Sequence, residues 1–535
     1  MNRIQNANSK GTPIYGNVLE SVMKLNEMIP KNDGVGDFSI LSSEAYDKPL
    51  PISGQNTETT IQFTTPNHDI SQIDDSFFIV DSTAVVSIPE LTATAFSGAV
   101  PYYCFAFKAS NQIFRQMRLL VNGVNTEYLS TECLRESYGF ANLKGKAEKT
   151  TKKHVYSQYK DAHEYRQGIC GVYVPASAFK NSGRVATLTF RFIIPIADIL
   201  PFQAMPLYPS RILGQLGLKV NFFMQGMVYC QVDPSKILEF NNFMNNAANT
   251  LDPMFGSTAF YDRFFTQVGD YGHLLDDDGT ASYISARVRP IVQSFSITRL
   301  SCQMAGYMIK SESFNAIGQY LQSNPLIVPA QQLQYVSYST IPNAAGFTGS
   351  TPVLFNGCES ISVMFPTTTQ QMTVFKNPNI QNLQLKIGDK LMPPNPISTN
   401  TDVSPEFLAF QLVASDLGGA IEPTESWLYS LVGARTNESG VRYANSREDN
   451  TDFMANFAME RSNGGYVMDG FSTNSPVNVE LRFNPVNAGA NDVYYIPDPA
   501  DPTAHPIAPE LWICNETYFI MSPSGIKYVP EPYRG

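Results

Sequence analysis

The amino-acid sequence predicts an all-β protein made of two domains in tandem. Apolar and polar residues alternate with a period of two along much of the chain, which is the pattern of antiparallel strands with one buried face. The 35 Gly and 36 Pro interrupt the chain often, as turns between strands require, while 34 Phe and 27 Tyr favour extended structure. At 535 residues the chain exceeds what one hydrophobic core usually serves.

Alternating segments fill the first half of the chain, from about residue 59 to residue 231. Each segment has apolar side chains at every second position, so that one face can be buried while the other contacts water. In one of them Ser82 is the single polar interruption of the apolar face. The apolar positions are Ile61 and Phe63; Phe78, Val80, Ala84, Val86 and Ile88; Ala186, Leu188, Phe190 and Phe192; and Leu216, Leu218, Val220 and Phe222.

A hairpin is predicted at Asn122-Gly123. Met117, Leu119 and Val121 share one face of the segment that leads into this pair. Both positions of a tight hairpin turn need a positive φ, which Asn and Gly adopt most readily, so the pair is a strong hairpin signal. Gly388-Asp389, which follows another alternating segment, is a weaker signal of the same kind.

The strand pattern restarts after an irregular stretch rich in Asn, Phe and Asp. We therefore expect an N-terminal arm (1–50), a first domain (51–235), a connecting segment (236–283) and a second domain (284–535). The last segment, 511–529, predicts a closing strand, a turn and a final short strand. The alternating positions of the second domain are Ile284, Ala286 and Val288; Ile291, Gln293, Phe295 and Ile297; Leu383, Leu385 and Ile387; and Val477, Val479, Leu481 and Phe483.

Few helices are expected, and all of them are short. Gly16–Ile29 has Val18, Val22 and Leu25 at helical spacing and is followed by a proline, so it predicts an amphipathic helix within the arm. A second helix is expected over Tyr128–Tyr138. Helices do not alternate with strands and no repeat is visible, which disfavours α/β folds and solenoids. Jelly rolls and other β-sandwiches fit this pattern equally well.

The charge balance disfavours a nucleic-acid-binding protein. The formal net charge is −11, so the chain as a whole repels a polyanion. One basic segment, 144–153, contains five lysines. A solvated loop is the simpler interpretation of this segment, and a contact with an acidic neighbour or an internal genome is the alternative. No specific nucleic-acid binding is expected.

The cysteines predict free thiols rather than disulfides or a zinc site. Their number is odd, they are widely scattered, and no CxxC pair occurs among Cys104, Cys133, Cys170, Cys230, Cys302, Cys358 and Cys514. Such usage is typical of proteins that fold in a reducing compartment. The N-terminus has no signal-peptide core and no run of about 18 apolar residues occurs, so synthesis inside a cell is expected. The N-glycosylation sequon at Asn515 is therefore weak evidence for secretion.

Motifs for catalysis or metal binding are missing. The five histidines (His68, His154, His163, His273 and His505) show no metal-binding spacing, and no nucleophile elbow or phosphate-binding loop follows a strand. The acidic run Asp276–Asp278 lacks the spaced oxygens of a calcium loop. Asp74-Asp75 is interpreted as a turn pair, and Trp512, Tyr518 and Phe519 as core residues rather than a sugar-stacking platform. We expect no catalytic, cofactor-binding or metal-binding residues, and no enzyme.

Five segments resemble a known family. The chain is similar to the double jelly-roll major capsid proteins of the adenovirus-like tailless viruses, and most similar to those of virophages and of Polinton (Maverick) and Polinton-like viruses. The resemblance rests on the order and spacing of soft patterns in both halves of the chain. The segments are TTIQFTTPNHDISQIDDSFFIV (59–80), FRQMRLLVNGVNTEYLSTECLRESYGF (114–140), ILPFQAMPLYPSRILGQLGLKVNFF (199–223), FKNPNIQNLQLKIGDKLMPPNP (375–396) and ELWICNETYFIM (510–521).

The resemblance implies two tandem eight-stranded antiparallel jelly rolls in a chain that forms homotrimers. Three copies would make a pseudo-hexameric capsomer, and a lattice of these trimers would form the icosahedral capsid of the virion, assembled inside the host cell. Loops at one end of the strands would form the outer towers, and the N-terminal arm would lie inside. Expected partners are other copies of the chain, penton proteins and minor capsid proteins. Contact with an internal membrane is left open.

Two alternatives remain at this point. The poxvirus scaffold protein is also a double jelly roll, but it forms a transient lattice on immature membranes rather than a final shell. A β-sandwich carbohydrate-binding or adhesion protein belongs to a different class, and it would require secretion and exposed sugar-stacking aromatics. The free cysteines and the missing signal peptide argue against the second alternative.

Overall fold

The structure is a computed structural model of the whole chain, 535 residues long. It is described for the residues whose placement is well defined, and every statement below concerns those residues. They are 48–50, 58–62, 69–89, 102–107, 110–130, 172–181, 184–199, 202, 205, 207–222, 226–232, 266–269, 272–273, 287–340, 346–366, 375, 380–399, 454–459, 471–485 and 508–529.

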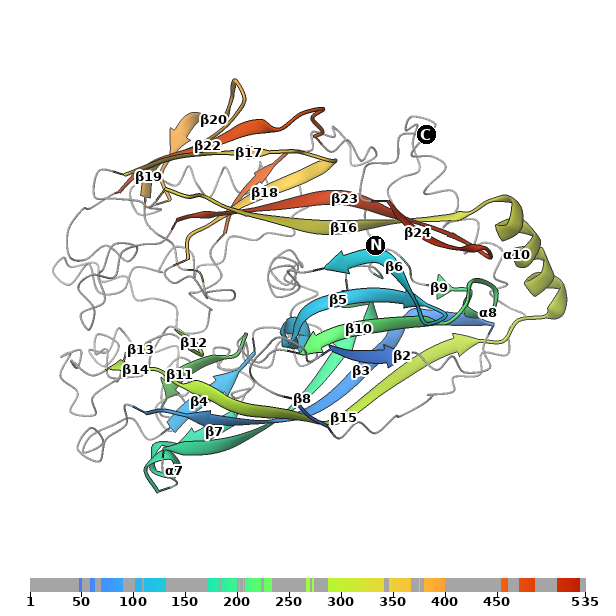
Figure 1. Cartoon of the computed structure of the whole chain (residues 1–535), viewed down its shortest axis with the longest axis horizontal. Coiled ribbons are helices and arrows are strands. Elements are labelled where there is room, and N and C mark those ends of the chain that lie inside the picture. The colour runs from blue at the N-terminus through green and yellow to red at the C-terminus, as the bar shows by residue number, and fades with distance from the viewer. Residues whose placement is uncertain are drawn as a thin grey trace, which may run out of the picture.

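Two units, each made of two facing antiparallel sheets, lie side by side, the second above the first in Figure 1, with their long strands running roughly along the long axis of the molecule. In the first unit one sheet has the order β1-β15-β3-β8, with β9 also paired to β3, and the other has the order β2-β10-β5-β6. The strands of the first unit are β1 (Lys48–Leu50), β2 (Glu58–Gln62), β3 (Ile70–Ser87), β5 (Phe114–Val121), β6 (Val124–Ser130), β8 (Val185–Pro195), β9 (Leu207–Tyr208), β10 (Leu216–Phe222) and β15 (Ile291–Tyr307).

The second unit repeats this plan. One sheet has the order β16-β23-β18-β21, with β24 added to β23, and the other has the order β17-β22-β19-β20. Its strands are β16 (Leu326–Ser337), β17 (Phe347–Val353), β18 (Cys358–Met364), β19 (Ile380–Ile387), β20 (Lys390–Ile397), β21 (Ala455–Ala458), β22 (Val477–Pro485), β23 (Glu510–Ser522) and β24 (Gly525–Val529).

A smaller sheet is attached to the first unit at one end. Its order is β12-β11-β4-β7. A separate two-stranded ladder, β13-β14, lies between β12 and β15 in the chain. All of these strands come from connections between the main strands of the first unit, so they are insertions into a common frame. They are β4 (Tyr102–Ala106), β7 (Val172–Pro175), β11 (Val228–Val232), β12 (Thr266–Gln267), β13 (Gly272–His273) and β14 (Arg287–Val288).

Helical turns in the described residues are short, as the sequence predicts. The longest helix, α10 (Ser311–Ser323), joins the two units, and α8 (Ser210–Leu213) lies close to it at the same end of the molecule (Figure 1). The others are η1 (Ser110–Ile113), α7 (Ala176–Asn181) and η2 (Ile196–Asp198). The expected helix over Gly16–Ile29 lies outside the described residues.

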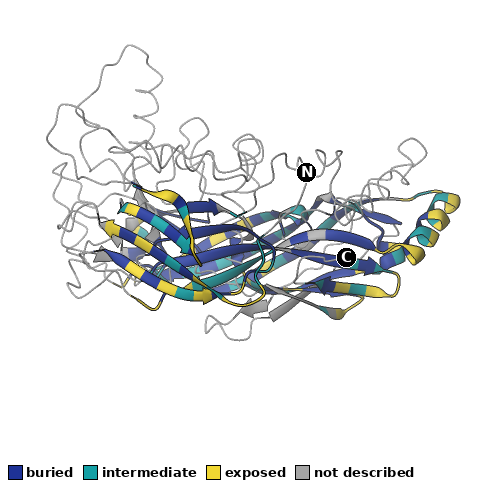
Figure 2. Cartoon of the chain, turned by 90° about the horizontal axis from the view of Figure 1, so that it is seen from above, coloured by how far each residue is buried: buried dark blue, intermediate teal, exposed yellow. Residues whose placement is uncertain are grey.

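Alternation in the sequence becomes alternation in burial. Along β8 the side chains are buried and more exposed in turn, and the stripes of this pattern are visible on the strands in Figure 2. The predicted apolar positions of β3, β5, β8 and β10 are all buried, and so are Leu383, Leu385 and Ile387 in β19. Each apolar side chain contributes about 1.5–3 kcal/mol on transfer from water, so this one-faced burial fixes the register of each strand.

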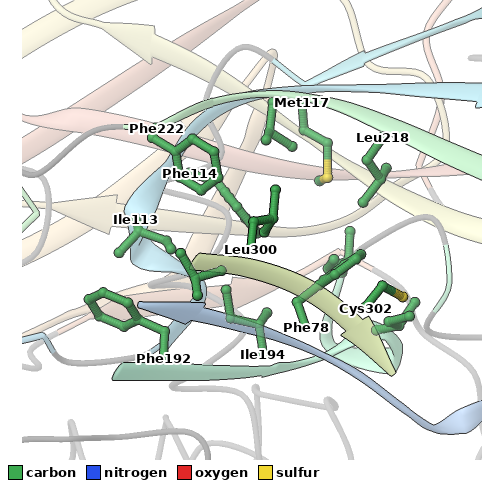
Figure 3. Packing of buried hydrophobic residues seen from close by; sticks show 14 of the residues in the cluster. Phe78, Ile113, Phe114, Met117, Phe192, Ile194, Leu218, Phe222, Leu300 and Cys302 are labelled. Atoms are coloured by element: carbon green, nitrogen blue, oxygen red, sulfur yellow. The ribbon is translucent and has the colours of Figure 1, made fainter. Parts of the chain in front are cut away.

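The core of the first unit lies between its two sheets. Figure 3 shows side chains of β5 and β10, such as Met117 and Leu218, pointing toward those of β3, β8 and β15, such as Phe78, Ile194 and Leu300. Rings pack edge to face in this layer, with the centroids of Phe107 and Phe192 5.1 Å apart. Because residues from both sheets interdigitate, neither sheet of the unit could bury its apolar face alone.

The predicted hairpins are present. Asn122 and Gly123 have φ values of 49° and 77° at the β5–β6 turn, as a tight hairpin requires. Gly388, with a φ of 58°, lies at the β19–β20 turn. The closing strand, turn and final strand are β23 and β24, joined at Ser522↔Gly525.

The expected boundary between the two domains differs from the observed pairing. Residues 291–307 were expected to begin the second domain, but β15 pairs with β3 of the first unit, from Ile291↔Ser87 to Tyr307↔Ile70, with three register shifts. The boundary that this pairing supports is α10, and segment 236–283 belongs to a connection within the first unit. One of the shifts lies between Val292 and Ser294, so Gln293 is exposed instead of sharing the buried face of Phe295.

One smaller expectation is also wrong, and another is contradicted in part. Asp74-Asp75 was expected in a turn between two strands, yet β3 runs unbroken from Ile70, the partner of Tyr307, to Ser87. The pair lies where the register with β15 shifts, between Gln72 and Phe77, and a bulge of this kind lets a polar pair remain within a strand. The helix expected over Tyr128–Tyr138 is contradicted only at its start, where residues 128–130 continue the β6 ladder; residues 131–138 lie outside the described residues, so the rest of this expectation stays a prediction.

Candidate functional site

The residues considered for chemistry do not form a site among the described residues. No group of three or more His, Cys, Asp or Glu that could hold a metal ion occurs in the part of the chain that the structure describes. Trp512, Tyr518 and Phe519 are each at most 1% exposed, which confirms the prediction that they are core residues. The Asp276–Asp278 run and the lysines of 144–153 lie outside the described residues.

The cysteines with described side chains are buried and are thiols rather than disulfides. Cys104, Cys302, Cys358 and Cys514 confirm the prediction of reduced thiols at these four positions. Burial raises the pKa of the Cys302 thiol well above its usual value, because a thiolate would lose its hydration there. These thiols are therefore packing residues. Asn515 is also buried, in β23, and its side-chain amide donates a hydrogen bond to Gln334, so its sequon is not displayed on the surface.

The connections between strands differ between the two ends of the units. The β5–β6 and β19–β20 turns and the β17–β18 connection are tight. By contrast, the connections β3–β5, β6–β8 and β10–β15 of the first unit are long and carry the smaller sheet, and 398–454 separates β20 from β21. In Figure 1, β4, β7 and β11 to β14 lie at the opposite end of the molecule from α8 and α10. Among the described residues, the strand frame of the first unit thus carries the smaller sheet at one end.

The two units share buried apolar side chains. The β16–β23 ladder begins at Leu326↔Met521 and Val328↔Phe519, and these four residues belong to the same apolar cluster as the core of the first unit. Tyr528 of β24 joins them, with its ring 5.2 Å from that of Phe519. Further along the same ladder, Val336↔Leu511 belongs to the core of the second unit. One ladder therefore contributes to both cores.

Polar side chains separate these two apolar ends of the ladder. The Tyr528 hydroxyl donates a 2.8 Å hydrogen bond to Gln332, and Asn515 lies opposite Gln332 in the ladder. Thr517, the next buried residue along β23 on this face, lies opposite Ala330. The change from apolar to polar side chains along this face marks where one core ends and the next begins.

The linker between the units is also attached to the first unit. Ile317 and Leu321 of α10 are fully buried in the first unit's apolar cluster. Just before the helix, the backbone N–H of Ile309 donates a 3.0 Å hydrogen bond to Oδ2 of Asp69, whose other oxygen accepts a 2.7 Å hydrogen bond from Arg211. The guanidinium carbon of Arg211 lies 5.1 Å from the centre of the Phe314 ring.

The α8 turn that carries Arg211 is held in place by its neighbours. The Tyr208 hydroxyl donates a 2.9 Å hydrogen bond to the carbonyl of Gly214, and burial raises the pKa of this phenol, so it remains protonated and able to donate. Ser71 of β3 donates to Ser210 at 3.1 Å. The charged group of Arg211 is thus positioned by a braced turn rather than by a free loop.

Nothing in the sequence reasoning singled out Asp69, Arg211 or α10. Asp69 and Arg211 are 142 positions apart. They lie in two of the segments that carry the resemblance, 59–80 and 199–223, but nothing in those segments marks them as a pair. The periodic signal that could have identified α10 was present in Phe314, Ile317 and Leu321, which recur at helical spacing.

The outward face of the sheet that contains β3 is polar and carries an ion pair. Arg191 of β8 donates two hydrogen bonds to the carboxylate of Asp81, at 2.6 and 3.0 Å, and Arg299 of β15 lies nearby. The hydrogen bond from Arg191 is the largest influence on the pKa of Asp81 and lowers it. Burial opposes this effect, and the charges of Arg191 and Arg299 lower the pKa further. Among the described residues, no helix is long and apolar enough to cross a membrane.

Comparison with known proteins gives no match to a family model and no match to a curated protein sequence. Solved structures are similar at low sequence identity. PBCV-1 VP54, fitted into a reconstruction of the virophage Sputnik, is 9% identical with a TM-score of 0.48, over 94% of this chain and 98% of that one. The mavirus major capsid protein is 11% identical with a TM-score of 0.46, over 94% and 91%. The Sputnik virophage structure is 10% identical with a TM-score of 0.44, over 94% and 92%.

Strand order decides the fold of this chain. In each unit the first, eighth, third and sixth main strands form one sheet, and the second, seventh, fourth and fifth form the other. This is the order of a jelly roll, in which two Greek keys fold into two facing sheets. The fold is a double jelly roll. The prediction of two tandem eight-stranded jelly rolls with few short helices is thereby confirmed for the described residues.

Proposed function

We propose that this double jelly roll is a viral major capsid protein. One observation carries the proposal, namely that one chain contains two jelly rolls of identical strand order, packed against each other through a shared apolar cluster. Three such chains around a threefold axis place six similar units in a ring. A ring of this kind approximates a hexagon, and hexagonal tiles can cover a closed shell by repeating the same contacts.

The capsomer on this proposal is a homotrimer, and trimers assemble into the icosahedral capsid of the virion inside the host cell. The smaller sheet at one end of the strand frame supports an outer surface there, because loops can vary on a stiff core. Penton and minor capsid proteins fill the positions that trimers cannot occupy. The role is structural, with no catalytic residues and no cofactor.

The mass and shape of the purified full-length chain test this proposal. Light scattering should give a particle of about three times 59.3 kDa, and negative-stain microscopy should show hexagonal outlines or shells. A chain that stays monomeric across a range of salt concentrations and pH values would contradict the proposal. A glycan array with the same preparation should show no binding, whereas specific binding would favour a carbohydrate-binding protein.

A second measurement separates a final shell from a transient scaffold. Quantitative mass spectrometry of mature particles should find this chain as the most abundant protein. Its presence in immature particles alone, followed by loss on maturation, would favour a scaffold of the poxvirus type.

A further inference from the structure

A buried carboxylate lies where three segments of the double jelly roll meet. Asp69 directly precedes β3, is 3% exposed, and accepts hydrogen bonds on both oxygens. One donor is Arg211 of α8, and the other is the backbone N–H of Ile309 in the linker between the jelly rolls. A carboxylate removed from water is stable only when such donors replace its hydration, so the three segments depend on one another.

The same contacts continue into the linker helix. The Arg211 guanidinium lies over the ring of Phe314, which is in the first turn of α10. The backbone N–H of Arg211 also donates a 3.4 Å hydrogen bond to the backbone carbonyl of Asp69. Ile317 and Leu321, one and two turns later, are buried in the apolar cluster to which both jelly rolls contribute. The direction in which the chain leaves the first jelly roll is therefore fixed at Ile309 and again along α10.

Two kinds of contact hold the jelly rolls together, and they differ in geometry. The apolar contact of Leu326, Val328 and Phe519 with the first unit's cluster is strong, but hydrophobic attraction has no preferred direction. Hydrogen bonds to a charged group are directional and short-ranged. The apolar contact can therefore keep the units together, whereas the contacts of Asp69 can set their angle.

We propose that Asp69 is a positioning residue that locks the linker at Ile309 and so sets the angle between the two jelly rolls. The effect of Asp69 on assembly rests on the proposed capsid function, since a capsomer needs every jelly roll at a fixed angle. The effect of Asp69 on the linker of a single chain does not rest on that function, because it can be measured whether or not capsomers form.

Asp69→Asn is the direct test. The substitution keeps the size of the side chain but replaces one acceptor oxygen with an NH2 group. Whichever way the amide turns, that group faces a donor, either Arg211 or the Ile309 N–H. Hydrogen exchange at the Ile309 amide should become about tenfold faster or more, because a hydrogen bond to a charged group has a strength of that order. Exchange across α10 should rise with it.

Asp81→Asn is the matched control. It removes a carboxylate from the same strand and breaks an arginine ion pair, but that pair joins β3 and β8 on the outward sheet face, away from the linker. Exchange at Ile309 should then stay within about twofold of the unmodified chain, since surface pairs contribute little. Equal effects of the two variants, or unchanged exchange in Asp69→Asn, would overturn the proposal.

Arg211→Gln keeps the test decisive if Asp69→Asn does not fold. It removes the cation beside Asp69 and Phe314 but leaves the Asp69–Ile309 hydrogen bond partner in place. Faster exchange over α10 together with a lower yield of capsomers would support the proposal, and no change in exchange would contradict it. If the unmodified chain forms no capsomers, the proposed function fails, while exchange at Ile309 still decides the role of Asp69.

Discussion

Asp69 and Asp81 show how position decides what a paired carboxylate does. Both accept hydrogen bonds from an arginine, and both arginines extend into solvent. Asp81 joins neighbouring strands of one sheet, so its loss affects only a contact between β3 and β8, which eleven backbone ladder pairs already hold together. Asp69 lies just beyond the last ladder pairs, Tyr307↔Ile70 and Tyr208↔Ser71, so its hydrogen bonds hold residues that the sheet no longer pairs. The charge is equal, and the structural consequence is different.

The contribution of Asp81 should depend on pH in one direction. Its pKa in the folded chain lies below the usual value near 3.9, so its pairing stabilises the fold above that value and is lost as the pH falls through the lowered pKa. Urea unfolding should show Asp81→Asn slightly less stable than the unmodified chain at pH 7, and this difference should shrink as the pH is lowered below about 3.9. A difference that does not shrink at low pH would contradict this account.

The four buried cysteines should resist alkylation in the folded protein. Burial keeps Cys302 as a neutral thiol, and only the thiolate reacts at a useful rate. Iodoacetamide treatment followed by peptide mapping should leave Cys104, Cys302, Cys358 and Cys514 unmodified until urea is added. Rapid labelling of any of the four under native conditions would mean that its strand opens more readily than its burial implies.

At the scale of the element, turns and strand ends fix what alternation alone cannot. The β5–β6 turn is attached to the start of β10, where the backbone N–H of Asn122 donates to the carbonyl of Gln215 and the Asn122 side chain accepts from the Gln215 N–H, each at 2.8 Å. Gly214 makes this approach possible, since it has a φ of 105° and a Cβ there would lie 2.3 Å from the Asn122 side chain. These contacts hold the β5–β6 hairpin turn against the start of β10.

Gly214→Ala and Gly318→Ala should change stability in opposite directions. Alanine at 214 combines a left-handed backbone with a clash against Asn122, and it should cost about 1–3 kcal/mol. Alanine at 318 meets open space within α10, and it should add about 0.5–1 kcal/mol through helix propensity. Chemical unfolding of the two variants measures both values. A stabilised Gly214→Ala chain would show that the turn can move away from β10.

Sequence reasoning succeeded where a structural cause is local and failed where it is distant. The period-two pattern identified the buried faces of β3, β8 and β10, because each strand carries that information in its own residues. It could not assign β15 to the first unit, since its partner β3 lies more than 200 positions earlier and both jelly rolls use similar strands. The Asp69–Arg211 pair was missed for the same reason, because two distant charges have no signature before the chain folds.

For the whole molecule, the shared apolar cluster should couple the two jelly rolls, so that they unfold together. Phe519 is fully buried and belongs to the cluster that includes the first unit's core, whereas Phe483 is buried in the second unit's own core. Both are aromatic residues of a long strand in the second unit, so they differ mainly in which core they fill. This difference allows the coupling between the units to be measured separately from the stability of either one.

Phe519→Ala should uncouple the units, while Phe483→Ala should weaken only the second. Each loses a buried ring, at a cost of about 3–5 kcal/mol. Calorimetry should show the single transition of the unmodified chain split into two in Phe519→Ala, with proteolysis cutting in the linker. In Phe483→Ala only the transition of the second unit should move to lower temperature. The same calorimetric profile for both variants would mean that the shared cluster does not couple the units.

The place of β15 in its sheet has a consequence for synthesis on the ribosome. β15 pairs with both β1 and β3, so a nascent chain that has not yet emerged to Tyr307 leaves the long edge of β3 uncovered. An uncovered edge of that length can pair with another nascent chain. Translation of the long β10–β15 connection therefore prolongs the interval in which nascent chains on neighbouring ribosomes can aggregate. Chaperone binding to the nascent chain should fall sharply once β15 has left the exit tunnel.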